Sequence, residues 1–356
     1  MEALTPRDTQ DLLGHEEAEQ RLLDGWRSGR LAHAWLIGGP RGIGKATLAY
    51  RFARFVLGGG EGSGGLFGPV TDTLHMAPDH PIFRHVASGT HADLKVVERG
   101  WSDEKPSKRR TEILVKDVRE IGAFLSLTPA GGGWRVVIVD TADEMNRNAA
   151  NALLKVLEEP PRRALLLLVS HSPGGLLPTL RSRCRALMLR PLAVDLVEAR
   201  LREWRPELSS VDASALARLG EGSLGRVLAL ADSGGLTLYR DMIGLLSGLP
   251  RMDAVALHAF IDRVAKTDSA YDAAAELLVW WLARVIRGGA CGIPEPEVVM
   301  GEGGLADRLA RGCSLDQWVE VWEKITRLFV RADAVNLDPR QVMLGAFLAV
   351  EKQVRQ

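Results

Sequence analysis

The chain has 356 residues, of which 46% are hydrophobic, and its 45 lysines and arginines balance its 45 aspartates and glutamates. Such a chain can bury the cores of two or three domains, and its balanced charge excludes a bulk attraction to nucleic acid or to an anionic membrane. The three cysteines are far apart, the amino terminus lacks a signal-peptide pattern, and no apolar run approaches the ~18 residues of a membrane span. We therefore expect a cytoplasmic protein with no contact to a membrane.

Short apolar runs alternate with helical patterns in the first half of the chain, which predicts an α/β layer with a parallel sheet. Strands are expected at residues 34–38, 94–97, 134–139, 164–169 and 186–189, and helices at 45–57, 115–125 and 147–158. After about Pro191 the strand patterns end, and the remainder is expected to be helical with a break at residues 247–250. The predicted fold class is α/β followed by all-α.

A glycine-rich loop joins the first expected strand to the first expected helix. Residues 39–45 read Gly-Pro-Arg-Gly-Ile-Gly-Lys, the start of a pattern whose backbone N–H groups bind phosphate oxygens and whose lysine reaches the β- and γ-phosphates. The pattern ends in a hydroxyl side chain that coordinates Mg²⁺, but this chain has Ala46, with Thr47 one position too late. We predict weak nucleotide binding without efficient hydrolysis; the alternative is a glycine turn with a solvated lysine. The predicted site comprises Gly39, Gly42, Gly44, Lys45 and Thr47.

A carboxylate, Asp140, ends the strand expected at residues 134–139. In a nucleotide site of this kind it would hold a metal-bound water, and otherwise it is a strand-end carboxylate paired with a nearby loop. An active ATPase would carry a catalytic glutamate next, but this chain has Thr141. Asp143 and Glu144 are near in sequence, and the directions of their side chains are open. We add Asp140 to the predicted nucleotide site.

A second cationic candidate is Arg183, which lies within Ser182-Arg183-Cys184 in the loop that precedes the last expected strand. An arginine at a loop tip is usually a surface cation of little energetic value. The alternative is an arginine finger, a planar guanidinium that reaches into a neighbouring subunit and stabilises charge on a transferring phosphoryl group. The sequence pattern alone leaves both interpretations open.

Several longer motifs together resemble the clamp-loader branch of the AAA+ family. The most specific are residues 151–161, Asn-Ala-Leu-Leu-Lys-Val-Leu-Glu-Glu-Pro-Pro, and residues 180–184, Leu-Arg-Ser-Arg-Cys. Residues 33–36 and 88–94 add to them. The resemblance covers roughly residues 12–230, and the carboxyl-terminal helices match only loosely, through residues 336–340.

The resemblance implies three domains: a RecA-like AAA+ module with a degenerate phosphate loop at 1–190, a small helical lid at 191–247 and a helical collar at 248–356. It implies a stator in a hetero-pentameric ring with gamma/tau motor subunits and a delta subunit. Such a ring loads a sliding clamp onto primed DNA for DNA polymerase III. In this branch Arg183 would act on a neighbour's ATP, with Ser182 and Cys184 as motif neighbours, and Ala46 and Thr141 agree with a stator.

Two departures from the family pattern bear on ligands. Many relatives insert a four-cysteine zinc module after the glycine-loop helix, whereas residues 58–81 contain no cysteine, so we predict no zinc and no required cofactor. His75, His80, His85 and His91 are expected to be solvated or hydrogen-bonded loop residues. In the lid, Gly225 stands where motor subunits carry a nucleotide-sensing arginine. Arg226 is one residue off, about 100° around a helix.

Two alternatives to the stator remain: an active motor ATPase of the same ring, and a free-standing phosphotransferase with a phosphate loop. Ala46 and Thr141 argue against the first. The second would require an acceptor pocket and an intact Mg²⁺ site, and the sequence indicates neither. The apolar run at residues 274–286 is too hydrophobic for one stripe of a surface helix. Burial within the domain explains most of this run, and contact with neighbouring subunits is a possible explanation for the rest.

Overall fold

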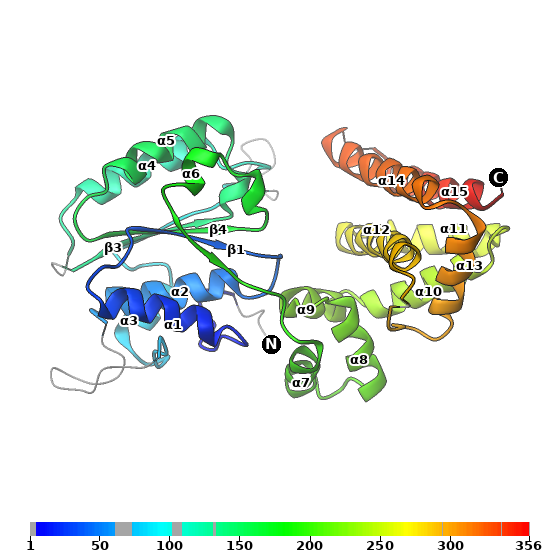
Figure 1. Ribbon diagram of the computed structural model, residues 1–356, viewed down its shortest axis with the longest axis horizontal. Helices are drawn as coiled ribbons and strands as arrows, with labels where there is room; N and C mark the ends of the chain where they lie inside the picture. The colour runs from blue at the N-terminus through cyan, green and yellow to red at the C-terminus, as the bar shows by residue number, and fades with distance from the viewer. Residues whose placement is uncertain are drawn as a thin grey trace. The chain divides into compact units, whose positions relative to one another are not determined.

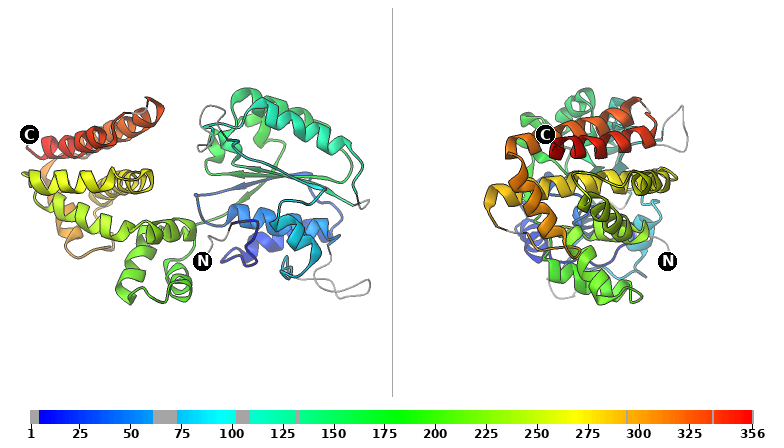
Figure 2. Two further views of the ribbon diagram at one scale, coloured as in Figure 1. Left: turned by 180° about the vertical axis from the view of Figure 1, so that it is seen from behind. Right: turned by 90° about the vertical axis from the view of Figure 1, so that its right-hand side faces the viewer.

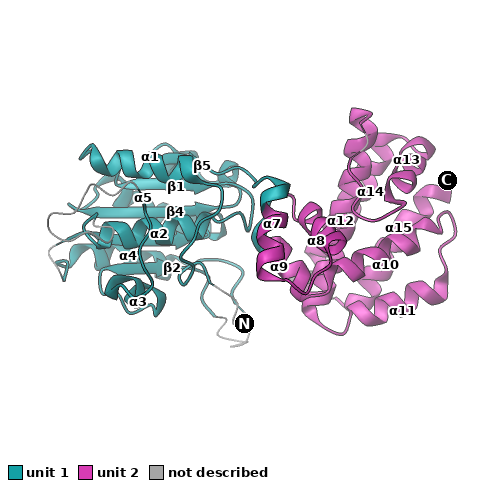
Figure 3. Ribbon diagram, turned by 90° about the horizontal axis from the view of Figure 1, so that it is seen from below, with its two compact units in different colours: residues 1–196, 222–225 teal, residues 197–221, 226–356 magenta. Residues whose placement is uncertain are grey.

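The computed structural model describes residues 5–60, 73–101, 109–130, 133–293, 295–335 and 337–355. The chain divides into two compact units (Figure 3). The first unit comprises residues 1–196 and 222–225, and the second comprises residues 197–221 and 226–356. The predicted boundary between lid and collar, at residue 247, lies inside the second unit.

The first unit is built on a parallel sheet with the strand order β2-β3-β4-β1-β5 in the described part of the chain. The strands are β1 (Ala34–Gly38), β2 (Leu94–Val97), β3 (Arg135–Asp140), β4 (Ala164–Ser170) and β5 (Arg185–Met188). All five expected strands are confirmed, each within one residue of its predicted bounds. The central strands are buried throughout, as a sheet covered on both faces requires.

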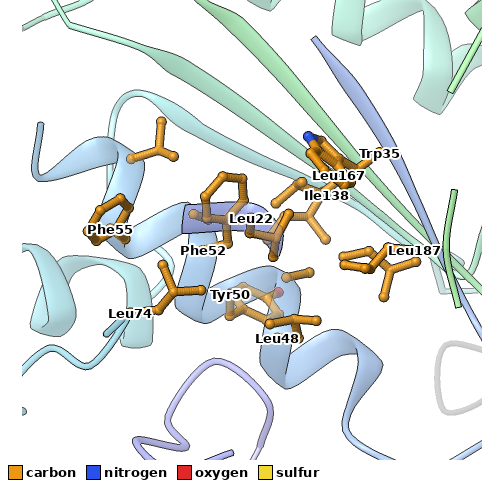
Figure 4. Packing of buried hydrophobic residues seen from close by; sticks show 14 of the residues in the cluster. Leu22, Trp35, Leu48, Tyr50, Phe52, Phe55, Leu74, Ile138, Leu167 and Leu187 are labelled. Carbon is orange, nitrogen blue, oxygen red and sulfur yellow. The ribbon is translucent and has the colours of Figure 1, made fainter. Parts of the chain in front are cut away.

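Helices cover both faces of this sheet (Figures 1 and 2). One face carries α1 (Glu16–Arg27), α2 (Lys45–Leu57) and α3 (Pro81–Ala87), and the other carries α4 (Val115–Ser126), α5 (Arg147–Glu158) and α6 (Pro178–Arg181). Alternate residues of β4 serve the two cores: Leu165 and Leu167 pack with α1 and α2, and Leu166 packs with α4 and α5. Figure 4 shows the first of these cores.

The strand order brings three polar segments to one edge of the sheet. β1 leads into the glycine loop, β3 ends at Asp140, and β4 ends at Ser170. β4 lies between β1 and β3, with Gly38 beside Ser170 and Asp140 beside Val169. The carboxyl ends of parallel strands are the usual binding edge of such sheets. The fold therefore gathers the predicted phosphate loop and the predicted carboxylate at one edge.

The described part of the second unit is helical throughout, as expected after residue 191. Its helices are α7 (Val194–Trp204, which begins in the first unit), α8 (Ser210–Leu219), α9 (Leu224–Asp232, likewise), α10 (Gly235–Ser247), α11 (Ala254–Val264), α12 (Asp268–Cys291), α13 (Glu302–Gly312), α14 (Leu315–Val335) and α15 (Pro339–Arg355). The predicted break at residues 247–250 is confirmed between α10 and α11.

The apolar run at residues 274–286 lies within α12. Its large side chains, among them Leu278, Trp281 and Leu282, are buried inside the unit itself. The buried face of α12 therefore accounts for the apolar excess without a neighbouring subunit. Among the helices of the described residues, none is long and apolar enough to cross a membrane.

Candidate functional site

The glycine loop has backbone angles that residues other than glycine could adopt only with strain. Gly39, Gly42 and Gly44 have φ angles of 142°, 75° and 105°, in the range that L residues rarely adopt. A Cβ at Gly39 would also lie 2.5 Å from the Leu189 carbonyl oxygen. Gly44 caps α2 without a side-chain hydrogen bond, so the N–H groups of the first helical turn are not capped by a side chain. The loop thus has the strand–glycine–helix geometry that the sequence predicts.

Lys45 is turned inward at the start of α2. Its side chain is buried, with 3% of the residue exposed, and Nζ donates a hydrogen bond to the Pro40 carbonyl oxygen of the same loop. Burial lowers the pKa of Lys45 to about 8, against the opposing attraction of Asp143 and Asp140. The ammonium group is therefore still mainly charged at neutral pH, and its hydrogen bond is to its own loop.

Two neighbouring segments of the first unit form hydrogen bonds with backbone carbonyl groups of the glycine loop. The Gly225 N–H donates to the Gly42 carbonyl oxygen at 2.9 Å, and His15 Nε2 donates to the Ile43 carbonyl oxygen at 2.7 Å. A Cβ at Gly225 would lie 3.0 Å from Gly42 Cα, so only glycine permits this approach without a shift. The loop is therefore fixed by protein contacts on its outer side.

Arg226 belongs to the second unit. It forms ion pairs with Glu276 at 3.0 Å and with Glu221 at 3.5 Å, and its guanidinium lies over the Trp280 ring. These contacts are within the second unit. That Arg226 does not contact nucleotide, because it is one residue away from the nucleotide-sensing position, stays a prediction.

Asp140 is surrounded by polar groups at the carboxyl edge. Its burial raises its pKa, and the Thr141 hydroxyl, which donates to Asp140 Oδ1 at 3.3 Å, partly opposes this shift. The same hydroxyl lies 3.3 Å from His171 Nε2. The Thr141 side chain is therefore a hydroxyl between two polar neighbours, and a hydroxyl is not basic enough to activate water.

The two acidic residues after Thr141 have definite partners. Asp143 Oδ1 accepts a hydrogen bond from the His171 backbone N–H at 2.9 Å. Glu144 forms an ion pair with Arg99 at 2.8 Å. The sequence left the directions of these two side chains open. In the structure, Asp143 points to the backbone of His171, and Glu144 points to Arg99.

His171 is a site residue that the sequence analysis did not identify. It follows β4 directly, between the glycine loop and Asp140. Burial, followed by the nearby charge of Lys45, lowers the pKa of His171 to about 4. The imidazole is therefore neutral at neutral pH. A titratable residue directly after β4, at the edge where the glycine loop lies, was the signal that could have found it.

Thr47 lies in the first turn of α2, and Ala46, which precedes it, has no side-chain oxygen to offer a metal ion. Among the residues that the structure describes, no group of three or more histidine, cysteine, aspartate or glutamate side chains is placed to hold a metal ion. Part of the segment without cysteine, residues 61–72, lies outside the described residues. The four histidines near it each form a hydrogen bond: His75 with Gln10, His80 with the Ile82 N–H, His85 with Thr90, and His91 with the Asp93 N–H.

Arg183 lies in the turn between α6 and β5. Its Nη2 forms an ion pair with Glu158 Oε1 at 2.8 Å, and its Nη1 donates to the Thr179 carbonyl oxygen at 3.0 Å. The side chain is 36% exposed. Ser182 Oγ donates to the same carbonyl at 3.1 Å, which braces the turn.

Cys184 anchors this turn to the protein. Its side chain packs against the core formed by α4, α5 and the sheet, and burial raises the pKa of the thiol to about 11. The sulfur is therefore a neutral packing group. Arg183 is presented by a turn with a buried residue on its carboxyl side.

The turn with Arg183 lies at the sheet edge opposite to the glycine loop. β5 runs parallel to β1, with Arg185 beside Trp35 and Met188 beside Gly38. Arg183 precedes β5 and Lys45 follows β1, so the two residues are separated by the length of the strands, on the order of 10 Å or more. The structure thus brings Lys45, Asp140 and His171 to one edge and leaves Arg183 at the other.

A parallel sheet in this order, with a glycine loop after its central strand and helical regions after its last strand, defines a RecA-like AAA+ module joined to a helical unit. The comparison with protein families extends this assignment. Residues 14–193 match the family model described as DNA polymerase III, delta subunit, and the chain belongs to this family.

Individual relatives agree with the family match. The chain is 40% identical to DNA polymerase III subunit delta' of Pseudomonas aeruginosa over 153 residues, which cover 43% of this chain and 42% of the relative. It is 33% identical to the delta' subunit of Escherichia coli over 218 residues, 59% of this chain and 58% of the relative. It is 31% identical to the E. coli tau subunit over 231 residues, 64% of this chain and 33% of the relative. The resemblance to DNA polymerase III clamp-loader subunits is confirmed, and each match spans less than two thirds of the relative's length.

Proposed function

We propose that the chain is the stator of a DNA polymerase III clamp loader, which presents Arg183 to the nucleotide of an adjacent subunit and hydrolyses little or no ATP itself. In this role it joins gamma/tau motor subunits and a delta subunit in a hetero-pentameric ring. The ring acts on a sliding clamp and on primer–template DNA in the cytoplasm. Residues 1–190, 191–247 and 248–356 serve as AAA+ module, lid and collar.

The observation that carries the proposal is the position of Arg183 relative to its own glycine loop. The two lie at opposite edges of one sheet, because Arg183 precedes β5 and Lys45 follows the parallel strand β1. An arginine finger must touch the phosphoryl group in the transition state. Arg183 does not reach a nucleotide bound at Lys45 of the same chain. If it stabilises a phosphoryl group, that group belongs to another subunit.

The state of the chain's own glycine loop supports the second half of the proposal. Lys45 donates to Pro40 within the loop, and Thr141 replaces a base with a hydroxyl bound to Asp140. Ala46 offers no side-chain oxygen to Mg²⁺. Backbone N–H groups and Lys45 can still attract phosphate, so we expect weak binding of ATP or ADP, no zinc and no required cofactor.

An active motor subunit is the second candidate, because the tau relative of E. coli matches 64% of this chain. The two candidates differ in the hydrolysis expected from the isolated chain. A motor would turn over ATP in the presence of Mg²⁺, and the proposed stator would not. A rate at the level of an intact AAA+ site would replace the stator proposal with the motor.

The main experiment replaces the proposed finger in a reconstituted ring. Wild-type or Arg183→Ala chain is assembled with the motor and delta subunits, and ATP hydrolysis is followed in single-turnover reactions with clamp and primed DNA. We expect hydrolysis at the one interface served by this chain to fall by about 10³-fold, the lower value for loss of an arginine finger. The other interfaces should keep their rates.

The control is Arg181→Ala, which removes an exposed arginine from the preceding helical turn. It should leave every phase of hydrolysis unchanged, and both variants should elute as intact rings. Unchanged kinetics for Arg183→Ala in an intact ring would remove the finger from the proposal.

A further inference from the structure

Glu158 is a carboxylate in an unfavourable local position. It is the last residue of α5, where the partial negative charge of the helix end disfavours an acidic side chain. The side chain is 49% exposed and forms an ion pair with Arg183. The adjacent Leu157 carbonyl oxygen accepts a hydrogen bond from His33 Nε2 at 3.1 Å, which ties this helix end to the start of β1. Glu158 is thus held at the edge of the sheet where Arg183 lies.

The contacts of Arg183 occupy only part of its guanidinium. The group has five N–H donors in a fixed plane. Nη2 contacts Glu158 at 2.8 Å, and Nη1 contacts the Thr179 carbonyl at 3.0 Å and Ser182 Oγ at 3.5 Å. At least two donors therefore remain for an incoming anion while all three contacts persist. Arg183 can bind phosphate oxygens without leaving Glu158.

We propose that Glu158 is a positioning residue for Arg183, an inference that rests on the proposed function. The carboxylate and the Thr179 carbonyl restrict a long side chain to one pose on its turn. A guanidinium that is already oriented loses less conformational freedom when it meets a neighbour's nucleotide. The exposed ion pair is weak enough for small adjustments at that moment.

The positioning role predicts which kinetic parameter changes when Glu158 is replaced. Arg183 would act on charge that develops in the transition state, so a disordered guanidinium lowers the turnover number and leaves the KM for ATP nearly unchanged. The expected loss is about two- to fivefold, the value of an exposed ion pair. A mere folding role for Glu158 would instead lower the yield of assembled rings.

The test uses Glu158→Ala and Glu158→Gln in the reconstituted ring, with and without Arg183→Ala. Glu158→Ala should lower the turnover number two- to fivefold, and Glu158→Gln should retain most of it because the amide oxygen still accepts from Nη2. In the Arg183→Ala background neither change should have any further effect. The matched control is Glu159→Ala, which removes the adjacent exposed carboxylate at the helix end and should leave the rate unchanged.

The outcomes separate the two proposals. If Arg183→Ala slows hydrolysis but Glu158→Ala does not, the positioning role is overturned and the finger stands. A Glu158→Ala effect that persists in the Arg183→Ala background, or that Glu159→Ala reproduces, also overturns it. If Arg183→Ala itself has no effect, the proposed function fails first.

Discussion

Lys45 and Arg183 are the two cations to which the proposed function assigns a phosphate group, and their surroundings are opposite. Lys45 is 3% exposed, donates to its own loop and has a pKa lowered to about 8. Arg183 is 36% exposed, lies at the other edge of the sheet and keeps unused donors. At the carboxyl edge of the sheet the cation is thus buried and hydrogen-bonded within its own loop, whereas at the amino edge the cation is exposed to solvent. This difference favours a subunit that assists a neighbour's chemistry.

The hydrogen bond between Gly225 and the glycine loop predicts a measurable loss of stability when Gly225 gains a side chain. Gly225→Ala would place a Cβ 3.0 Å from Gly42 Cα and 3.2 Å from its carbonyl oxygen, against backbone that cannot move independently. We expect a loss of about 1–3 kcal/mol in the free energy of unfolding, the usual cost of overpacking. Urea unfolding measures the loss, and hydrogen exchange at the Gly225 amide reports the broken contact with Gly42.

A matched glycine shows what the same change does without a close neighbour. Gly122 lies in α4 of the same unit, and a Cβ there would meet nothing within 4 Å. Gly122→Ala should therefore stabilise the chain by about 0.5–1 kcal/mol, because alanine is the better helix residue. An equal gain in Gly225→Ala would show that the contact between Gly225 and Gly42 does not stabilise the glycine loop.

The sheet and its two edges follow from the sequence because buried parallel strands are continuous apolar runs and the polar residues at their ends are easy to find. The glycine loop, Asp140 and the turn with Arg183 were predicted in this way. The direction of the Lys45 side chain was not predictable, since it depends on which carbonyl lies within reach. Nor was the Glu158–Arg183 pair, because residues distant in sequence meet only after α5 and α6 pack. Helices α1 and α3 were not predicted.

The buried polar groups at the carboxyl edge predict an intermediate effect, which depends on pH. The folded chain lowers the pKa of His171 from its ordinary 6.5 to about 4, so the unfolded chain binds more protons between these values. The free energy of unfolding should therefore fall as the pH decreases from about 6.5 to about 4. His171→Gln should remove about 1 kcal/mol of this decrease, a value reduced for solvent screening.

The comparison is made on urea unfolding curves of both chains across that pH range. Other groups at this edge titrate as well, including Asp140, so the difference between the two chains is the quantity of interest rather than either slope. Parallel curves for wild type and His171→Gln would mean that the imidazole is solvated, and the carboxyl edge would then be more open than its contacts indicate.

The smallest expected effect bears most directly on why the chain has Arg183. Its ion pair with Glu158 is exposed on both sides, so Arg183→Ala should change the free energy of unfolding by no more than about 1 kcal/mol. Arg54 is the contrasting arginine: it is buried, donates to the Arg7 and Thr9 carbonyl oxygens at 2.9 Å each and lies over the Phe83 ring. Arg54→Ala should cost about 2–4 kcal/mol because two partly buried carbonyls lose their charged donor and the side chain leaves a buried position. Urea unfolding of both variants in the isolated chain measures the two costs.

A cost for Arg183→Ala as large as that for Arg54→Ala would make Arg183 a structural residue, and its exposed position would no longer indicate a partner. A small cost, together with a large loss of hydrolysis in the ring, would mean that folding alone does not require this arginine.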